Sequence, residues 1–187
     1  TTYNQPEWLR KVLWGYECQT EKDFEIVIAD DGSGEETKKV IDEFHSNSQL
    51  KINHVWHPDE GYQKCPILNK AIIASNTEYL IFTDGDCIPR EDFIEVHLKN
   101  AEAGLFLSGG TVRLPMALST QLTREDITSQ QAFSLKWLYH NGLKRTNKSL
   151  KLVKKKWFTR TMNKLTPTNA SWNGHNASGW RKDIFAI

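Results

Sequence analysis

Two aspartates, one residue apart, follow a short apolar segment near the middle of the chain. Asp84, Gly85 and Asp86 come after Tyr79–Thr83, a run typical of a buried strand. Side chains alternate along an extended chain, so both carboxylates point to the same side, and the intervening glycine lets a phosphate or metal ion approach closely. Two like charges so near each other need a compensating cation, and carboxylates are hard oxygen ligands. The pattern favours a site for a divalent cation at Asp84 and Asp86; the alternative is an Asp-Gly turn without a ligand.

A second acidic pair, Asp30 and Asp31, follows the apolar segment Phe24–Ala29. Open α/β sheets bind ligands at the carboxyl ends of their strands, so one of these carboxylates could accept a hydrogen bond from the ring of a bound base. Gly32 would give the ligand backbone clearance. The alternative is that Asp31 or Ser33 caps the following helix, and the sequence leaves both interpretations open.

One lysine stands just before an expected helix, in the segment Gly61, Tyr62, Gln63 and Lys64. Backbone N–H groups at a helix N-terminus, together with a lysine, suit a diphosphate. The alternative is a solvated lysine. The sequence has neither a Walker-type loop nor a G-x-G-x-x-G motif.

Histidines and cysteines give no metal-binding pattern. His54, His57 and His97 are scattered, which favours structural roles, whereas His175 lies in a Gly- and Asn-rich loop of functional character. The chain has three cysteines, Cys18, Cys65 and Cys87. Their odd number and wide spacing favour a reducing, cytoplasmic compartment.

These residues need an alternation of strands and helices to position them. We expect helices at Pro6–Tyr16, Ser33–Phe44 (opened by a Ser33/Glu36 capping box), after Pro66, after Pro89 and within Gln121–Tyr139, and strands at Phe24–Ala29, Leu50–Trp56, Tyr79–Thr83 and Leu105–Val112. Such alternation predicts an α/β domain with a mostly parallel sheet. A chain of 187 residues suits one domain.

Charge divides the chain into unlike parts. Residues 1–126 carry 12 Lys/Arg and 22 Asp/Glu, whereas residues 127–187 carry 12 and 1, so the net charges of −10 and +11 sum to the overall +1. The segment Lys144–Lys164 is basic with interleaved aromatics, a pattern that suits an anionic partner or an anionic membrane surface; the alternative is a solvated loop. No apolar run reaches the roughly 18 residues of a membrane-spanning helix.

The motifs, in their order, resemble glycosyltransferase family 2, whose members are inverting enzymes with the GT-A fold. The matching segments are Thr1–Asn4, Asp30–Ser33, Leu68–Ile72, Thr83–Pro89 and the galactosyltransferase-like Gly174–Asp183. The resemblance implies a three-layer α/β/α sandwich, with a nucleotide-sugar-binding half at 1–113 and a basic acceptor-side half at 114–187. It also implies transfer of a sugar, from a UDP-sugar by preference, to an acceptor hydroxyl with inversion. The setting would be polysaccharide or cell-surface glycan synthesis, with a glycan or lipid-linked acceptor and no nucleic acid.

The resemblance also implies residue roles. Thr1, Tyr3 and Asp31, with Asp30 beside them, would hold the base and ribose, and Gln63 or Lys64 would approach the diphosphate. Asp84 would touch the ribose or the metal, Asp86 would coordinate Mn²⁺ or Mg²⁺, and Gly85 would give the ligand room. Asn176 and Trp180 would face the donor sugar or the acceptor.

The chain departs from the family pattern at both ends, where it looks truncated. The apolar strand expected before Thr1 and the acidic region that supplies the catalytic base after Asp183 are absent from the sequence. The catalytic residue is therefore unassigned, with Asp183 as a candidate, and His175 stands where the family often has cysteine. Two alternatives remain: a phosphohydrolase of the haloacid dehalogenase type, which also uses D-x-D after a strand, and a non-catalytic nucleotide-sugar or cation-binding module. The expected location is the cytoplasm, with the inner face of the membrane as an alternative within it.

Overall fold

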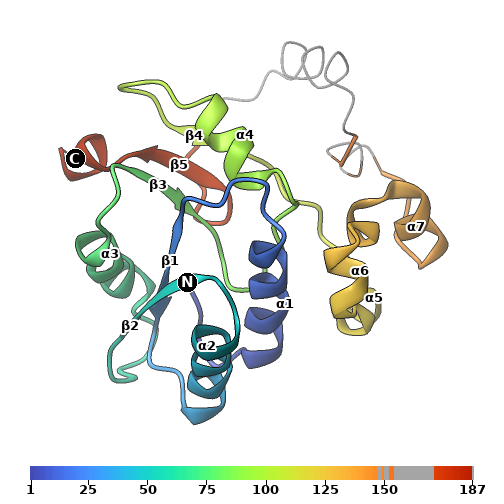
Figure 1. Ribbon diagram of the computed structural model, residues 1–187, viewed down its shortest axis with the longest axis horizontal. Helices are drawn as coiled ribbons and strands as arrows, with labels where there is room; N and C mark the ends of the chain where they lie inside the picture. The colour runs from blue at the N-terminus through green and yellow to red at the C-terminus, as the bar shows by residue number, and fades with distance from the viewer. Residues whose placement is uncertain (147–148, 150–151, 154–170, 187) are drawn as a thin grey trace.

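The computed structural model describes residues 1–146, 149, 152–153 and 171–186 (Figure 1). Its strands are β1 Glu25–Asp30, β2 Lys51–Trp56, β3 Tyr79–Phe82, β4 Leu107–Ser108 and β5 Ala177–Trp180. Its helices are α1 Pro6–Glu17, α2 Glu35–Asn47, α3 Lys64–Ala74, α4 Phe93–Lys99, α5 Met116–Gln121, α6 Arg124–Thr128, η1 Gln131–Phe133, α7 Leu135–His140 and α9 Arg181–Phe185.

Strands β1 and β2 form a parallel pair with helices on both faces. Figure 1 shows α1 and α2 on one side of this pair and α3 on the other. Alternation along β1 explains the layering: Ile28 packs with α1 and α2, whereas Ala29 packs with α3. The predicted α/β/α layering and the parallel pairing are confirmed for this part of the molecule.

The other three strands pair differently, in the order β3-β5-β4, with both pairings antiparallel. Among the described residues, the strands therefore pair both parallel and antiparallel. The parallel pairing that the sequence predicts is found between β1 and β2. The reason for the mixture is β5, which comes from the C-terminal segment and lies between β3 and β4, antiparallel to both. Sequence periodicity did not indicate this strand, which contains Ser178 and Gly179.

The predicted strand Leu105–Val112 is reduced to the two residues of β4. Gly109 follows at once, and a Cβ there would lie 2.4 Å from the side chain of Asn176. The backbone pairing with the C-terminal segment continues for one more residue, because the N–H of Gly109 donates to the carbonyl of Asn176 at 2.8 Å, opposite it in the antiparallel register.

Local hydrogen bonds also change two expected helices. The Ser33 hydroxyl accepts from the N–H of Asn4 at 2.8 Å, and α2 begins after Gly34 with no side-chain cap, so the predicted capping box does not form. A real capping box joins Thr123 and Asp126 and opens α6, which divides the helix expected within Gln121–Tyr139 into shorter pieces. Most of the basic segment Lys144–Lys164 lies outside the described residues.

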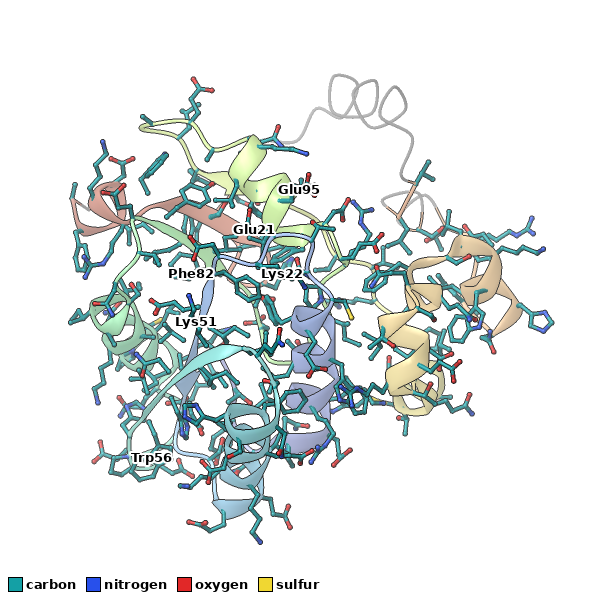
Figure 2. The ribbon with its side chains drawn as sticks, viewed as in Figure 1. Glu21, Lys22, Lys51, Trp56, Phe82 and Glu95 are labelled. Carbon is teal, nitrogen blue, oxygen red and sulfur yellow. The ribbon has the colours of Figure 1, made fainter. Side chains whose placement is uncertain are left out.

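Figure 2 shows where two strands end: Trp56 closes β2 and Phe82 closes β3. The Trp56 ring is half exposed, and its N–H donates to the carbonyl of Ser33 at 3.0 Å. Residues of the loops after both strands, Gly61 after β2 and Asp84 after β3, line the same cleft. Within the described part of the chain, no helix is long and apolar enough to cross a membrane.

Candidate functional site

A cleft of about 480 Å³ opens at the carboxyl ends of β1 and β3, beside the first turn of α3. The strand ends carry the acidic residues there, and α3 carries the lysine. Its lining combines acidic, basic and aromatic side chains with two glycines: Thr1, Thr2, Tyr3, Gln5, Trp8, Asp31, Gly61, Tyr62, Lys64, Asp84, Gly85 and Asp86. The structure thus brings Asp31, Lys64 and the Asp84–Asp86 loop together in one cleft.

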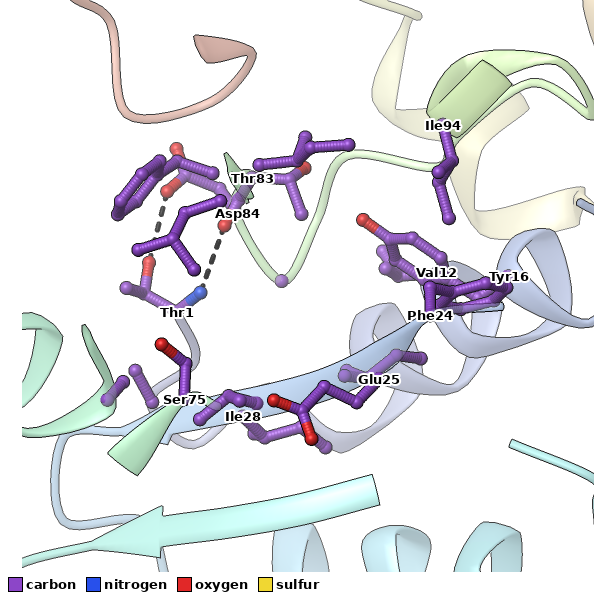
Figure 3. Close-up of a pocket in the computed structure, with 18 of the residues that line it drawn as sticks. Thr1, Val12, Tyr16, Phe24, Glu25, Ile28, Ser75, Thr83, Asp84 and Ile94 are labelled. Carbon is purple, nitrogen blue, oxygen red and sulfur yellow. Dashed lines mark hydrogen bonds between the residues drawn. The ribbon is translucent and has the colours of Figure 1, made fainter. Parts of the chain in front are cut away.

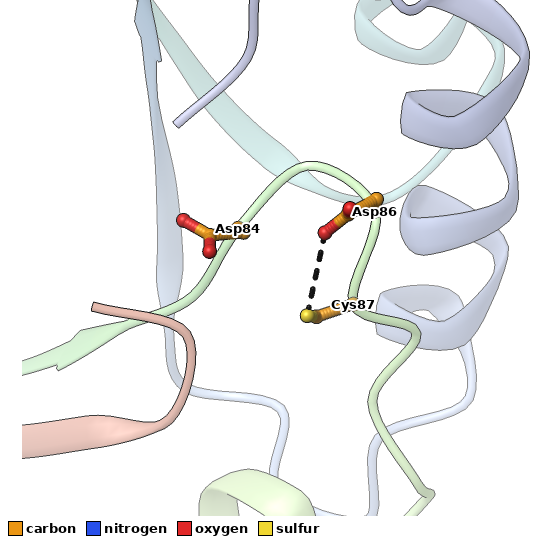
Figure 4. Close-up of side chains that lie close together, drawn as sticks. All are labelled: Asp84, Asp86 and Cys87. Carbon is orange, nitrogen blue, oxygen red and sulfur yellow. Dashed lines mark hydrogen bonds between the residues drawn. The ribbon is translucent and has the colours of Figure 1, made fainter. Parts of the chain in front are cut away.

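The loop after β3 brings three possible ligand groups together. One ligand atom each of Asp84, Asp86 and Cys87 lies within 4.8 Å of the others (Figure 4). The Cys87 thiol donates to Oδ1 of Asp86 at 3.4 Å, and burial, followed by the charge of Asp86, raises the pKa of this thiol to about 12. Without a metal ion the thiol is therefore neutral, and the two carboxylates are the anionic groups of this cluster. This hard oxygen set fits Mg²⁺ or Mn²⁺ better than a soft metal.

Asp84 is already paired, unlike Asp86. Nζ of Lys64 lies 2.7 Å from Oδ1 of Asp84, and the Thr1 hydroxyl donates to the same oxygen at 3.0 Å. Burial opposes ionisation of Asp84, but the hydrogen bond and charge of Lys64 outweigh it, so the pKa of Asp84 is lowered. Asp86 is exposed and has no ion pair among the described residues. A cation entering the cleft would meet Asp86 first.

Asp31 faces the cleft from a buried position and is held there by two partners. Its Oδ1 lies 2.7 Å from Nε2 of His57, and its Oδ2 accepts the N–H of Gln63 at 2.9 Å. Nζ of Lys70 donates to Nδ1 of His57 at 3.2 Å, so Nε2 carries the proton and donates to Asp31. Gln63, predicted as an alternative to Lys64 near the diphosphate, does not line the cleft and holds Asp31 through its backbone N–H.

Asp30 has a different position from its neighbour. Its side chain is buried; Oδ1 accepts the N–H of Ser33 at 2.9 Å, and Oδ2 lies 2.9 Å from Nε2 of His54. Burial opposes its ionisation, yet the hydrogen bonds from His54 and Ser33 lower the pKa of Asp30 overall. Asp30 is not among the residues that line the cleft. The structure uses it to shape the loop that carries Asp31.

The sequence did not identify His54 and His57 as partners of these carboxylates. The strand register contains the signal: His54 on β2 pairs with Ile28 on β1, two residues before Asp30. Diagonal neighbours on adjacent strands are within reach of long side chains. The register itself was not available from the sequence, which is why the histidines looked isolated.

Two glycines predicted to clear space for a ligand contact the protein itself. A Cβ on Gly32 would lie 2.6 Å from the backbone of Asp59, and its φ of +90° also favours glycine. A Cβ on Gly85 would lie 2.8 Å from the carbonyl of Thr1, to which Gly85 donates its N–H at 2.7 Å. The close approach at Gly85 is therefore filled by the N-terminal residues.

Aromatic residues form the mouth of the cleft. Tyr62 is 87% exposed and Tyr3 47% exposed, and both line it. The Tyr3 hydroxyl donates to Oδ2 of Asp59 at 2.7 Å, which raises the pKa of Tyr3. Their faces can stack on a planar base.

The residues predicted to face the sugar lie outside the cleft lining. Oδ1 of Asn176 lies 3.0 Å from Nε2 of His97, and Trp180 packs edge-on against Tyr79 at 5.2 Å between centroids. Asp183 accepts the N–H of Gly104 at 3.1 Å. The loop before β5 nevertheless approaches the site, because a Cβ on Gly174 would lie 3.9 Å from Nζ of Lys64.

Comparison with known proteins identifies the family. The family model "Glycosyl transferase family 2" matches residues 1–184. The chain belongs to glycosyl transferase family 2. The match confirms the predicted family and the GT-A type of α/β fold, and it decides against the phosphohydrolase alternative. Members of this family commonly use a divalent metal.

The chain is similar to a chondroitin synthase of Escherichia coli. The two are 32% identical over 77 residues, which is 41% of this chain and 11% of that protein. Glycosyltransferase AglE of Haloferax volcanii is 29% identical over 116 residues, covering 59% of this chain and 36% of that protein. The chain therefore spans well under half the length of these relatives. A solved structure of S. aureus TarS has a TM-score of 0.48 and 19% identity, over 63% of this chain and 37% of that chain.

Proposed function

We propose that this protein transfers a sugar from a nucleoside diphosphate sugar, a UDP-sugar by preference, to an acceptor hydroxyl with inversion. One observation carries the proposal: a single cleft brings together Asp31, Lys64 and the Asp84–Asp86 loop at the strand ends. A nucleotide sugar needs a hydrogen-bonding wall for its base and positive charge for its diphosphate. The cleft has Asp31 and the aromatics for the first need, and Lys64 for the second.

The residues have distinct roles in this proposal. Tyr3 and Asp31, with Thr1, would bind the base and ribose. Asp86 and the free oxygen of Asp84 would hold Mn²⁺ or Mg²⁺, and such an ion supplies charge compensation as the diphosphate leaves. The Lys64 ammonium is positioned to bind the same leaving group.

The proton from the acceptor hydroxyl needs a general base. In the part of the chain that the structure describes, the carboxylates lining the cleft are Asp31, Asp84 and Asp86, and each has a role above. The base is therefore unassigned. Asp183 lies with α9, bonded to the backbone of Gly104, so its position does not support that role.

The acceptor is proposed from charge. The chain carries 11 more positive than negative charges over residues 127–187, which suits an anionic glycan or a lipid-linked diphosphate at an anionic cytoplasmic membrane face. Replacing Lys154, Lys155 and Lys156 with glutamine should weaken binding to vesicles containing anionic lipid at low salt. Unchanged binding would remove the membrane part of the proposal.

The first test is calorimetric titration of UDP, then GDP, with and without Mn²⁺, on the wild type and on Asp86→Asn. We expect Mn²⁺-dependent UDP binding that falls about 100-fold in the variant, which is about 2.7 kcal/mol. Asp42→Asn is the matched control, because Asp42 is exposed on α2 and paired with Lys38.

Three results would change the proposal in different ways. Preference for GDP would retain the site and replace the donor's base. Equal binding with and without Mn²⁺ would remove the metal, and binding of neither nucleotide would overturn the proposal.

A further inference from the structure

His97 on α4 is a buried histidine whose two ring nitrogens both have a polar partner. Its side chain is 6% exposed. Nδ1 lies 2.6 Å from the hydroxyl oxygen of Ser178 on β5, and Nε2 lies 3.0 Å from Oδ1 of Asn176, one residue before β5. The ring of Phe93, one turn earlier on α4, packs edge-on against the imidazole with 4.8 Å between centroids. His97 does not line the cleft, so the proposed function gives it no direct contact with a substrate.

The partners of His97 determine which ring nitrogen carries the proton. Nδ2 of Asn176 donates to the carbonyl of Gly110 at 3.2 Å, so Oδ1 faces His97 and can only accept. Nε2 therefore donates to Asn176, and Nδ1 of the neutral ring accepts the hydroxyl of Ser178. The Ser178 oxygen lies 2.7 Å from the hydroxyl of Tyr79 and accepts from it. Burial is the main cause that lowers the pKa of His97, which keeps the ring neutral near neutral pH.

The far end of this hydrogen-bond chain is the loop Asn173–Asn176. The N–H of Asn176 donates to Oδ1 of Asn173 at 3.0 Å, and Nδ2 of Asn173 donates to the hydroxyl of Ser108 at 2.6 Å. The carbonyl of Asn176 accepts the N–H of Gly109 at 2.8 Å. Each polar atom of Asn176 thus has a protein partner, and His97 supplies the link to α4.

The middle of the same loop lies beside the lysine of the cleft. A Cβ on Gly174 would lie 3.9 Å from Nζ of Lys64, which is an ordinary van der Waals distance. This ammonium pairs with Asp84 at 2.7 Å, and all three residues line the groove between β1 and β3. Figure 3 shows Asp84 in that groove, bonded to Thr1, with the pale red C-terminal segment above them. The loop backbone is therefore a wall for the Lys64 side chain.

We propose that His97 is a positioning residue for sugar transfer: its Nε2–H binds Asn176 and holds the loop Asn173–Asn176 against Lys64, which keeps the ammonium directed toward the diphosphate. This inference deepens the proposed function and rests on it. The sequence favoured a structural role for His97, whereas here it acts on the site through two further residues. In the same proposal, Asn176 acts through the loop and makes no contact with the sugar.

The effect should reach the diphosphate and not the base. Without the Nε2–H, Oδ1 of Asn176 would lose its partner, and an unpaired group in a partly buried place favours movement of the loop toward water. Lysine has many rotamers, so a wall that restricts Lys64 before binding lowers the entropy cost of binding an anion. The residues proposed for the base, Tyr3 and Asp31, have no bond to this loop.

Two amide substitutions separate the two nitrogens of the ring. The amide of glutamine reaches the position of Nε2 and can donate to Asn176, whereas the shorter asparagine reaches the position of Nδ1 and keeps only the partner Ser178. UDP affinity at saturating Mn²⁺ should fall about 5-fold in His97→Asn and stay within about 2-fold of wild type in His97→Gln. Uridine affinity should be equal in all three proteins, because uridine has no diphosphate. Unchanged UDP affinity in His97→Asn, equal losses in both variants, or a parallel loss for uridine would overturn the proposal.

Ser178→Ala is the matched control on the other side of the ring. It removes the hydroxyl that Nδ1 accepts and leaves the bond from Nε2 to Asn176, so Tm should fall while UDP affinity stays the same. If His97 were merely structural, UDP affinity would follow Tm across the three variants. A second test places His97→Asn in a Lys64→Met background, where it should cause no further loss of UDP affinity, because the loop acts through the ammonium. Additive losses would contradict that route.

Two measurements without nucleotide separate this inference from the proposed function. NMR correlations between the ring nitrogens and the carbon-bound protons of His97 should show the Nε2–H tautomer at neutral pH; the Nδ1–H tautomer would overturn the proposal. Amide exchange at Gly109 and Asn176 should be about 10-fold faster in His97→Asn than in His97→Gln, and equal rates would also overturn it. If the wild type binds no UDP while exchange differs as expected, the proposed function fails and the hold of His97 on the loop remains.

Discussion

The acidic segments after β1 and β3 both consist of aspartates, but their carboxylate oxygens differ in how many hydrogen-bond partners they have. After β1, Asp30 and Asp31 use all four carboxylate oxygens in bonds to His54, His57, Ser33 and the backbone of Gln63. After β3, Asp84 is paired through one oxygen only, and Asp86 is exposed. The first pair is held by its hydrogen bonds, whereas the second keeps oxygens that could bind the metal we propose. Adjacent aspartates at strand ends are thus insufficient evidence for a metal, because the protein itself can occupy all of their oxygens.

Removing the Asp30 carboxylate should have the largest effect on stability. Asp30→Ala leaves the buried N–H of Ser33 and the partly buried ring of His54 without their partner, and an unsatisfied buried group costs about 1–3 kcal/mol. We expect a loss of about 3 kcal/mol in the free energy of unfolding, measured by urea denaturation. Asp23→Ala is the control, since the Asp23 side chain is 97% exposed. A loss of stability under 1 kcal/mol would show that the hydrogen bonds of Asp30 do not hold the loop after β1 rigidly.

The pH dependence of the same variant sharpens this prediction. The pKa of Asp30 is lowered in the folded state from 3.8. Its contribution is therefore fully present above pH 3.8 and disappears as the pH falls through the lowered folded value. The stability difference between wild type and Asp30→Ala should be constant near neutral pH and narrow in acid. A difference that persists unchanged far below pH 3.8 would assign the loss to packing alone.

A substitution of Lys64 tests the acidic loop after β3, and we expect a smaller effect, measured as a change in ligand affinity. Lys64→Met removes the cation that pairs with Asp84 at 2.7 Å and that we assign to the diphosphate. UDP affinity at saturating Mn²⁺ should fall about 10-fold, or about 1.4 kcal/mol. Affinity for Mn²⁺ alone should rise, because Asp84 loses its ion pair and keeps only the Thr1 hydroxyl as a partner. A parallel loss of both affinities would mean that the variant distorts the loop.

Lys70→Met is the matched lysine control, because Lys70 is exposed on the same helix and contacts His57. It should leave Mn²⁺ binding unchanged. If Lys70→Met reproduces the effect of Lys64→Met, the effect belongs to α3 as a whole and not to the Asp84 pair.

How far the sequence predicts the molecule also differs between regions. The helix at Pro6–Tyr16 and the strands at Asp30 and Phe82 were predictable, because local apolar periodicity coincides with burial there. Strand β5 was not, because its residues are small and polar and it pairs only through contacts distant in sequence. The convergence of Asp31, Lys64 and Asp84 followed from the topology of strand ends. The use of Asp30 in the loop, and of Asn176 by His97, depends on side-chain partners that only three-dimensional proximity determines.

The smallest effect on Mn²⁺-dependent UDP binding is expected from a substitution of Cys87. The thiol lies beside both carboxylates, so geometry alone would admit it as a third ligand. Its bond to Asp86 and the burial that raises its pKa to about 12 instead make it a neutral donor. Cys87→Ser keeps a donor for Asp86, so Mn²⁺-dependent UDP binding should stay within about 3-fold of wild type, under 1 kcal/mol. A soft ion distinguishes the alternatives: a metal-bound thiolate would favour Cd²⁺ over Mn²⁺, and serine would abolish that preference. Tight Cd²⁺ binding that is lost in Cys87→Ser would show that Cys87 is a metal ligand. The loop after β3 would then hold a different metal from the one proposed.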